Sequence, residues 1–266
     1  MSASENGQVN RNAAEVYEEF FVPALFQQWP SHVTGAAEIQ PGQRVLDVAC
    51  GTGVLARTVA DRVGSTGAVV GLDVNEGMLA VAQRKAPTLE WRQGRAEALP
   101  WDGDSFDAVV SQFGLMFFED RRIALEEMMR VLRPGGRLAV AVWDSLDHSP
   151  GYAAMADLLQ RLFGNQAANA LWAPFALADL QGLYTLFAEA GMPDIQITTQ
   201  AETARFPSLE AWVYTEIKGW TLADMLDETQ FQLLLKEAKN DLQQFVTSDG
   251  TVAFGASAHI VAAAKM

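Results

Sequence analysis

The sequence predicts an α/β protein built on a doubly wound, mostly parallel sheet, and three observations support this class. Between residues 44 and 143, short apolar runs alternate with segments whose apolar residues recur at helical spacing. The first apolar run ends at a turn with the pattern Gly-x-Gly, formed by Gly51 and Gly53. The 266 residues are 49% hydrophobic and 20% charged, which is the composition of a globular chain.

The elements of the first half follow in order. Residues 1–12 form a polar arm, and residues 13–29 an aromatic-rich helix that Pro23 is expected to interrupt, because proline lacks an amide hydrogen. Strands are expected at residues 44–49, 67–74, 88–94, 105–115 and 137–143, and helices at residues 53–63, 76–86 and 120–132. Strands that alternate with helices in this way form a parallel sheet with both faces covered.

The second half has a looser pattern. We expect an irregular or helical stretch at 150–175, a helix at 177–192, a strand at 194–206, a helical block at 208–245 and a seventh strand at 251–265. This order predicts an N-terminal helical arm or lid (1–35), a core (36–207 and 248–266) and a helical cap (208–247) inserted between the last two strands.

The predicted cap is rich in aromatic residues. They are Trp212, Tyr214, Trp220, Phe231 and Phe245. Pockets for small ligands are mostly apolar and aromatic, so the cap is a candidate wall of such a pocket. Packing onto the sheet, or a contact between two copies of the chain, is the alternative.

Charge and cysteine content narrow the classes of partner. The net charge of −14 disfavours nucleic acid, because like charges repel the phosphate backbone. The single cysteine, Cys50, forms no intrachain disulfide and is expected to be a small packed residue, and His32, His148 and His259 are too scattered for a metal site. The chain has no apolar run of the ~20 residues that a membrane span needs and no signal-like start. We therefore expect a cytoplasmic protein, as monomer or homodimer.

The glycine turn and the acid that follows it indicate an adenosine-containing ligand. Gly51, Gly53 and Ala56 fit the pattern G-x-G-x-x-[GA] between a strand and a helix, which is typical of dinucleotide sites. Asp73 ends the second strand, where its carboxylate can accept both hydroxyl protons of a ribose. Nicotinamide dinucleotides and S-adenosylmethionine both carry such a ribose. A tight turn without any ligand remains the alternative.

Asp47 indicates which of these two ligands the site prefers. It lies inside the first apolar run, just before the glycine turn. A carboxylate there would repel a pyrophosphate, whereas the amino group of S-adenosylmethionine is cationic and would be attracted. Asp47 therefore favours S-adenosylmethionine. The alternative is an aspartate that bonds only to nearby backbone N–H groups.

Four segments together resemble a known family. VLDVACGTGVLA (45–56) and GLDVNEGML (71–79) are similar to the first two motifs of the class I S-adenosylmethionine-dependent methyltransferases. GRAEALPWDGDSFDAVVSQFGLMFF (94–118) and EEMMRVLRPGGRLAV (126–140) are similar to their later motifs. The resemblance covers about residues 40–143 and is strongest to the small-molecule group with ubiquinone/menaquinone-type and methyltransferase type 11-like members. It implies a Rossmann-like sheet with S-adenosyl-L-methionine as cofactor.

The resemblance also implies roles for single residues. Around the methionine part of the cofactor it places Asp47, Ala49, Gly51 and Gly53. Asp73 would bind the ribose, Val74 and Met78 would pack on the adenine, and the backbone of Ala96 would contact the adenine edge. Gln112 and Phe113 would face the methyl group.

Arg95 departs from the family pattern, which commonly has an acid at this position. Arginine cannot accept a hydrogen bond from the adenine amino group. Glu97 or a backbone carbonyl is then expected to accept it, unless that amine faces water. Arg95 itself would stack on the ring or pair with an acid elsewhere.

The resemblance implies an enzyme that methylates a small, largely apolar molecule, such as a quinone, a lipid or a natural product. The candidate substrate residues are Tyr17, Phe117, His148 and Trp212. His148 is either a general base or a surface histidine, and no other base is evident from the sequence. An NAD(P)-dependent oxidoreductase and a non-catalytic protein that binds an adenosine cofactor are the alternatives.

Overall fold

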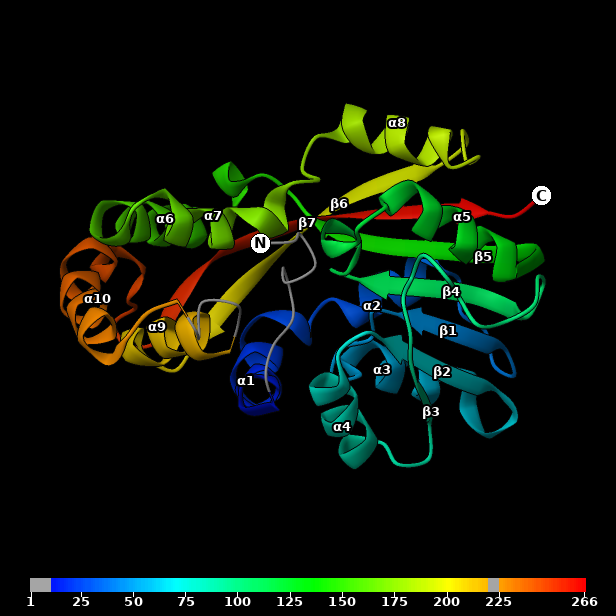
Figure 1. The fold of residues 1–266 in the computed structure, drawn as a ribbon, viewed down its shortest axis with the longest axis horizontal. Helices are drawn as coiled ribbons and strands as arrows, with labels where there is room; N and C mark the ends of the chain where they lie inside the picture. The colour runs from blue at the N-terminus through cyan, green and yellow to red at the C-terminus, as the bar shows by residue number, and fades with distance from the viewer. Residues whose placement is uncertain (1–10, 220–224) are drawn as a thin grey trace.

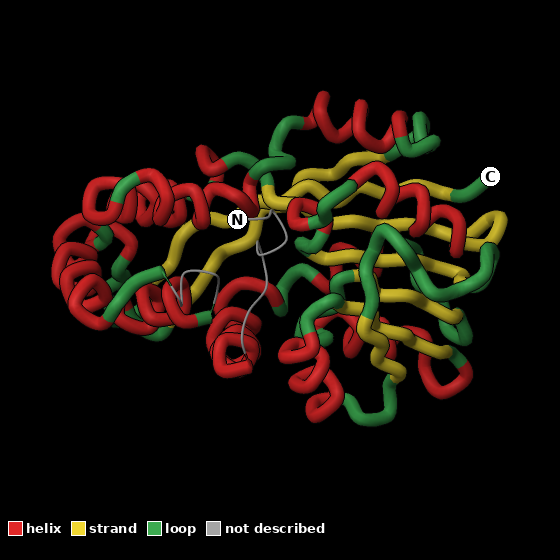
Figure 2. The backbone as a smooth tube through the Cα atoms, in the orientation of Figure 1, coloured by secondary structure: helices red, strands yellow, loops and turns green. Residues whose placement is uncertain are grey.

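In the part of the chain that the computed structural model describes, residues 11–219 and 225–266, a seven-stranded sheet forms the centre of the molecule (Figures 1 and 2). The strands are β1 (Arg44–Val48), β2 (Ala68–Asp73), β3 (Glu90–Gln93), β4 (Phe106–Gln112), β5 (Leu132–Trp143), β6 (Gln196–Phe206) and β7 (Val252–Ala264). Their order is β3-β2-β1-β4-β5-β7-β6, and β7 runs antiparallel to both neighbours. The predicted fold class is confirmed.

Helices cover both faces of the sheet. They include α2 (Pro30–Ala36), α3 (Val54–Val63), α4 (Glu76–Lys85), α5 (Arg121–Val131) and α8 (Leu180–Glu189). α5 contacts α8 on one face, and α2 contacts α3 on the other (Figure 1). Because both faces are covered, the central strands are apolar on both sides; Leu46 of β1 and Val109 of β4, for example, are fully buried.

The N-terminal segment differs from its prediction. Pro23 does not break the helix but lies inside a π-helix, η2 (Tyr17–Phe26), which continues α1 (Arg11–Val16). The wider turn bonds the amide of Gln27 to the carbonyl of Val22 instead of to Pro23. A π-turn spaces its hydrogen bonds five residues apart, so it tolerates a proline that an α-helix would not. A further short helix, α2, was not predicted.

β6 and β7 extend beyond the end of β5. They stay paired from Gln196 and Ala262 to Phe206 and Val252, whereas the pairing of β5 with β7 stops at Trp143. Four helices pack around this extension: α6 (Pro150–Phe163), α7 (Asn165–Trp172), α9 (Leu209–Lys218) and α10 (Glu228–Asp241) (Figure 1). The stretch 150–175, predicted as irregular or helical, is thus largely helical.

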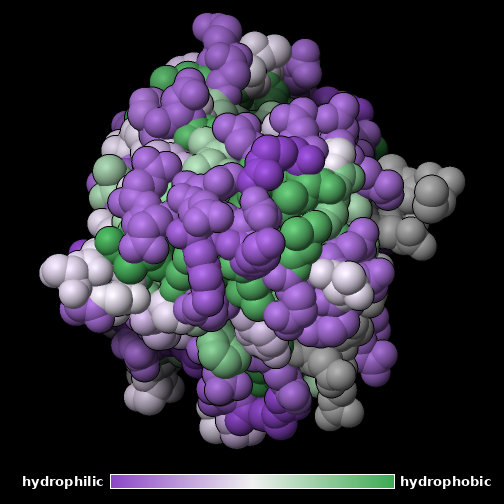
Figure 3. All heavy atoms as spheres, turned by 90° about the vertical axis from the view of Figure 1, so that its left-hand side faces the viewer, coloured by the Kyte–Doolittle hydropathy of each residue, from purple (hydrophilic) through white to green (hydrophobic). Residues whose placement is uncertain are grey.

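This cap end is only partly covered by hydrophilic side chains. Figure 3 looks onto it and shows hydrophobic side chains that reach the surface beside and between hydrophilic ones. Leu233 of α10 is one of the large apolar side chains that stay exposed. Trp220, one of the aromatic residues predicted for the cap, lies outside the described residues.

The described residues contain neither a membrane-spanning helix nor a cluster of metal-binding side chains. In these two ranges no helix combines the length and apolar character needed to cross a membrane. Nor do the same residues bring together three or more histidine, cysteine or acidic side chains that could hold a metal ion.

Candidate active site

Asp47 lies at the end of β1 and is 1% exposed. Among the described residues, neither of its carboxylate oxygens has a hydrogen-bond partner. The amide of Ala56 in α3 lies toward the carboxylate and lowers its pKa, but the contact does not reach hydrogen-bond geometry. Burial is the larger effect and raises the pKa of Asp47 well above its usual value, and the charge of Asp73 adds to this.

The turn after β1 has an unusual backbone. Ala49, Gly51 and Gly53 have φ angles of 58°, 55° and 85°, in the left-handed region that alanine rarely adopts. A side chain at Gly53 would overlap the ring of Trp91, so only glycine fits there. A Cβ atom at Gly51 would have no neighbour within 4 Å. The turn is thus strained at Ala49 and open above Gly51, which leaves its backbone accessible to a ligand.

Asp73 accepts hydrogen bonds from the loop after β1 and from the loop after β2. One of its carboxylate oxygens accepts the amide of Gly51 at 2.8 Å, and the other accepts the amide of Asn75 at 2.8 Å. Burial raises the pKa of Asp73, and these two N–H groups oppose the increase because they stabilise the ionised form. Since a carboxylate oxygen can accept more than one hydrogen bond, Asp73 keeps capacity for further donors.

Two apolar residues, Val74 and Met78, follow Asp73 in the sequence. Val74 is 43% exposed, although valine is usually buried, and Met78 packs against Ala14, Val81 and Tyr17. The exposed Val74 thus places an apolar side chain directly after Asp73 in the sequence.

Arg95 forms ion pairs with two acids. Its guanidinium lies 2.7 Å from Glu119 and 3.4 Å from Glu97, and the hydrogen bond to Glu119 raises its pKa. Glu97 also accepts the backbone amide of Glu119 at 2.9 Å. The sequence left open whether Arg95 stacks on the adenine ring or pairs with an acid, and in the structure it pairs with acids. Glu97 already binds this arginine and the loop before α5.

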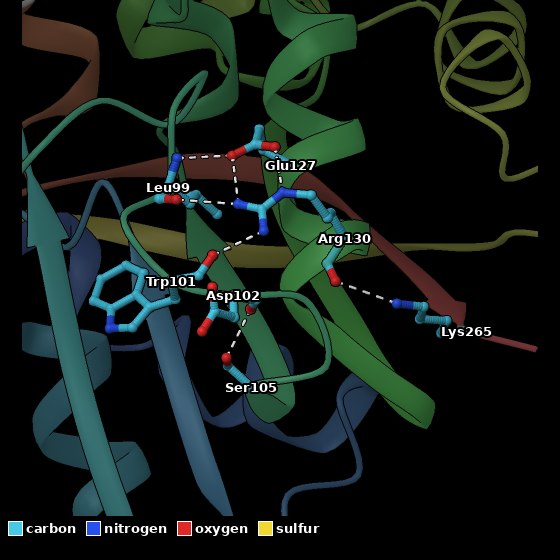
Figure 4. Close-up of polar contacts among 7 residues, drawn as sticks. All are labelled: Leu99, Trp101, Asp102, Ser105, Glu127, Arg130 and Lys265. Carbon is cyan, nitrogen blue, oxygen red and sulfur yellow. Dashed lines mark hydrogen bonds and ion pairs between the residues drawn. The ribbon is translucent and has the colours of Figure 1, made fainter.

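The loop that carries residues 95–97 is anchored by a polar network (Figure 4). Arg130 of α5 donates to the carbonyl oxygens of Leu99 at 3.0 Å and Trp101 at 2.8 Å, and Glu127 accepts the amide of Leu99 at 2.9 Å. Lys265, near the end of the chain, donates to the carbonyl of Arg130 at 3.2 Å. The loop beside the candidate adenine site is therefore fixed from α5.

The N-terminal segment is tied to the helices that follow β1 and β2. The carboxylate of Glu18 is 3.0 Å from Arg57 of α3 and 3.6 Å from Lys85 of α4, so one acid on η2 pairs with both flanking helices. Arg57 also donates to the carbonyl of Thr52 in the glycine turn at 2.7 Å. The pairs tie the N-terminal segment, α3, α4 and the turn into one unit.

The end of β4 carries Gln112 and Phe113, which contact the N-terminal segment and Trp143. Gln112 donates from its side-chain amide to the carbonyl of Phe26 at 3.2 Å, while its own side-chain oxygen is buried and has no partner among the described residues. Phe113 has a left-handed φ of 57° and stacks on Trp143, with ring centres 3.8 Å apart and planes 6° apart. Phe26 lies 5.8 Å from Phe113 and 6.0 Å from Trp143, measured between ring centres.

Behind Trp143 lies a small aromatic cavity of about 30 Å³. Its lining residues are Phe21, Leu25, Phe26, Trp143, Tyr152, Leu171, Pro174, Phe175 and Glu216. They come from η2, the end of β5, α6, the region of α7 and α9. The cavity is thus built where the N-terminal segment meets the cap helices, one ring away from Phe113.

Glu216 and Tyr152 are the polar side chains of this lining, and the sequence reasoning missed both. Glu216 is 3% exposed and accepts the indole N–H of Trp212 at 3.2 Å. The hydroxyl of Tyr152 is buried, and its interaction with the Glu216 carboxylate lowers the pKa of Glu216 against the effect of burial. One signal could have found Glu216: it lies four residues after Trp212, on the apolar stripe of its helix.

The four predicted substrate residues lie in different places, and none is among the lining residues of the cavity. Tyr17 stacks on Phe26 at 5.0 Å, and burial, together with the nearby acids, raises its pKa. Phe117 lies in a short turn after β4 and packs against the core. His148 is 65% exposed and pairs with Asp144 at 2.7 Å. Trp212 is fully buried and orients Glu216.

The residues around the cleft fit S-adenosylmethionine. The unpartnered carboxylate of Asp47 suits a cationic amino group, and the unpartnered oxygen of Gln112 suits a second donor nearby. The open turn at Gly51 lets a ligand approach the backbone, and Val74 offers an apolar edge. Together with the strand order, this site defines the protein as a class I S-adenosylmethionine-dependent methyltransferase.

The chain belongs to the ubiE/COQ5 methyltransferase family, whose model matches residues 18–156. It is 36% identical over 204 residues to a demethylmenaquinone methyltransferase of Staphylococcus epidermidis. This alignment covers 70% of this chain and 84% of that protein. It is 38% identical over 143 residues to the ubiquinone/menaquinone biosynthesis C-methyltransferase UbiE of Xanthomonas campestris, over 50% of this chain and 56% of that protein.

Solved structures share the fold at low identity. The YcgJ protein of Bacillus subtilis matches with a TM-score of 0.61 and 19% identity, over 90% of this chain and 98% of that one. Phosphoethanolamine N-methyltransferase 2 of Haemonchus contortus, solved with S-adenosyl-L-methionine, matches with a TM-score of 0.63 and 18% identity, over 100% of this chain and 60% of that one.

Replacing Asp73 with alanine is expected to weaken S-adenosylmethionine binding by about 1–3 kcal/mol, the value of two hydrogen bonds. The carboxylate is expected to bind the ribose, and it also orders the glycine turn through Gly51. Isothermal titration calorimetry measures the change, with Asp61→Ala on the exposed side of α3 as the control. Unchanged affinity in Asp73→Ala would show that the ribose lies elsewhere.

Replacing Arg95 with alanine is expected to change S-adenosylmethionine affinity by less than about tenfold, or ~1.4 kcal/mol. The reason is that Arg95 is committed to Glu119 and Glu97 on the surface, and exposed ion pairs contribute little. The same titration measures it. A loss of several hundredfold would mean that the guanidinium contacts the adenine directly.

Proposed function

We propose that this methyltransferase methylates a ring carbon of a reduced, quinone-type molecule. The observation that carries the proposal is the cluster of aromatic side chains beside Phe113, because flat rings pack well against aromatic walls. The names of the relatives support it: one is a demethylmenaquinone methyltransferase and another a ubiquinone/menaquinone biosynthesis C-methyltransferase.

We propose the following division of work in the cleft. Asp47 would bind the amino group of the cofactor, Ala49, Gly51 and Gly53 would surround its methionine part, and Asp73 would bind its ribose. Val74, Met78 and the loop at Arg95, Ala96 and Glu97 would enclose the adenine. Gln112 and Phe113 would direct the methyl end toward Trp143 and the cavity. When bound, S-adenosylmethionine supplies an electrophilic methyl carbon and a thioether leaving group.

The protein would then contribute by aligning the two reactants and by excluding water from them. Alignment of bound reactants can be worth about 7–11 kcal/mol of the barrier. The N-terminal segment (1–35) would act as a lid over the cofactor, because Glu18 joins it to α3 and α4. The cap (208–247) would close the other side of the cavity through α9. The net charge of −14 further supports a small-molecule acceptor over nucleic acid.

The direct test is an assay with purified protein, S-adenosylmethionine and a short-chain demethylmenaquinol kept reduced under anaerobic conditions. Mass spectrometry should detect one added methyl group, and NMR should place it on a ring carbon. The oxidised quinone and phosphoethanolamine serve as controls. Methylation of phosphoethanolamine but not of the quinol would refute the proposal.

A further inference from the structure

We propose that Tyr17 distinguishes S-adenosylmethionine from its demethylated product, S-adenosylhomocysteine: the oxygen of its neutral hydroxyl faces the sulfonium, whose positive charge the product lacks. The inference rests on the roles proposed above for Asp47 and Asp73, and it is independent of the identity of the methyl acceptor. It assigns Tyr17 to the cofactor, whereas the sequence suggested this residue for the substrate.

The first argument is the position of the Tyr17 ring. Tyr17 begins η2 and packs against a small cluster that includes Met78 and Val81 of α4. It also stacks on Phe26, with ring centres 5.0 Å apart and planes 25° apart. Met78 is proposed to enclose the adenine, and Phe26 lies 5.8 Å from Phe113 at the proposed methyl end. The ring of Tyr17 therefore contacts residues at both ends of the proposed cofactor site.

Ion pairs on both sides of Tyr17 in the chain hold it in this position. Glu15 of α1 lies 3.1 Å from Arg84 of α4, and Glu18 lies 3.0 Å from Arg57 of α3. α1 also packs directly on α4. The backbone of Tyr17 is thus fixed to the two helices that follow the glycine turn and Asp73.

The second argument is the charge around the Tyr17 hydroxyl. Burial raises the pKa of Tyr17 above its usual value, and the charges of Glu18, Asp73 and Asp47 raise it further, so the hydroxyl stays neutral. Glu18 is already paired with Arg57, whereas Asp47 and Asp73 belong to the proposed cofactor site. A hydroxyl oxygen has two lone pairs besides its O–H donor. Carboxylates orient the O–H dipole with its proton toward them, and the lone pairs then serve a positive charge.

The covalent structure of S-adenosylmethionine determines which of its atoms this hydroxyl would face. The sulfur atom joins the amino-acid chain to the ribose. If Asp47 binds the amino group and Asp73 binds the ribose, the sulfonium lies between two carboxylates whose charges both act on the Tyr17 hydroxyl. An oxygen lone pair is attracted to the sulfonium and to the methyl hydrogens that the sulfonium polarises.

Methyl transfer removes this attraction. At neutral pH, S-adenosylmethionine carries an ammonium, a sulfonium and a carboxylate group, whereas S-adenosylhomocysteine keeps only the ammonium and the carboxylate. The ring of Tyr17 would contact both ligands equally, but its hydroxyl oxygen would stabilise only the charged one. Tyr17 would thus favour the cofactor over the product and assist product release.

The test uses Tyr17→Phe, which keeps the ring and its packing and removes only the hydroxyl. Tyr184→Phe is the matched control, because Tyr184 is 42% exposed on α8. Isothermal titration calorimetry measures the Kd of both ligands. We expect Tyr17→Phe to raise the Kd of S-adenosylmethionine about three- to tenfold and that of S-adenosylhomocysteine less than about twofold. Tyr184→Phe should change neither value.

The ratio of the two Kd values decides the proposal. No change in this ratio, whether both ligands weaken equally or neither does, would overturn the role of Tyr17. Asp73→Ala, titrated with the same two ligands, separates this failure from a failure of the proposed site. If Asp73→Ala weakens both ligands while Tyr17→Phe leaves the ratio unchanged, the cofactor site stands and only the inference on Tyr17 falls. If neither substitution affects binding, the proposed cofactor site is wrong as well.

Discussion

Replacing Asp47 with asparagine is expected to weaken S-adenosylmethionine binding by about 2–3 kcal/mol, or about 30- to 150-fold, while making the ligand-free enzyme more stable. Binding weakens because the cationic amino group loses a buried carboxylate that has no other partner among the described residues. Stability rises because the variant no longer buries a group that ionises.

The sign of the stability change follows from the pKa. Burial raises the pKa of Asp47 in the folded state above its value in the unfolded chain. Between these two pKa values the native state binds more protons, so the stability of the wild type falls as pH rises. Asparagine does not titrate, so the advantage of the variant should grow over this range, by up to about 1.4 kcal/mol per pH unit.

Urea unfolding without cofactor at several pH values measures the stability difference, and calorimetry measures the affinity. Asp61→Asn, at an exposed position of α3, is the control for removing one negative charge. A variant that binds S-adenosylmethionine as tightly as the wild type, or that is less stable at every pH, would show that Asp47 is a structural residue.

Replacing Trp212 with alanine is expected to lower the free energy of unfolding by about 3–5 kcal/mol, the usual cost of a cavity left by a large buried ring. Trp212 is fully buried and contacts the rings of Phe254 at 4.7 Å and Phe206 at 5.9 Å. The substitution also removes the donor to Glu216. Denaturant unfolding measures the loss.

Tyr214→Ala on the same helix is the matched control, because Tyr214 is 39% exposed whereas Trp212 is fully buried. Its cost should stay near or below about 1 kcal/mol. Equal effects of the two substitutions would mean that α9 is a loosely attached lid. The contacts of Trp212 instead make the inner face of α9 part of the hydrophobic core, so the proposed cap has no simple boundary with the rest of the molecule.

The positions of the acids and glycines proposed to bind the cofactor could be predicted, because they depend on local pattern. Asp47 lies near the end of one short apolar run and Asp73 near the end of the next, and the ends of neighbouring parallel strands meet at one edge of the sheet. The glycine turn follows the first run directly, so its place at this edge was also predictable. Pro23 shows where prediction from local pattern fails. Proline usually interrupts an α-helix, but here the chain continues through it as a π-helix.

The cavity could not be predicted, because its walls come from segments far apart in the sequence. Glu216 and Tyr152 line the same cavity only because β6 and β7 extend past β5 and the cap helices pack around this extension. Read alone, each of their helices shows an ordinary apolar stripe, and a single acid on it carries no sign of what it faces. Arg95 is similar, since its partner Glu119 reaches it from another loop.

By itself, the sequence determined the doubly wound sheet, the acids and glycines of the cofactor edge, and the preference for S-adenosylmethionine. These follow from residue spacing within short segments, where backbone geometry sets which side chains share a face. Only the tertiary structure decided the aromatic cavity and its two polar groups. They depend on how the N-terminal segment and the cap helices pack together, and packing between distant segments is set by the shape and burial of the whole core rather than by any local pattern.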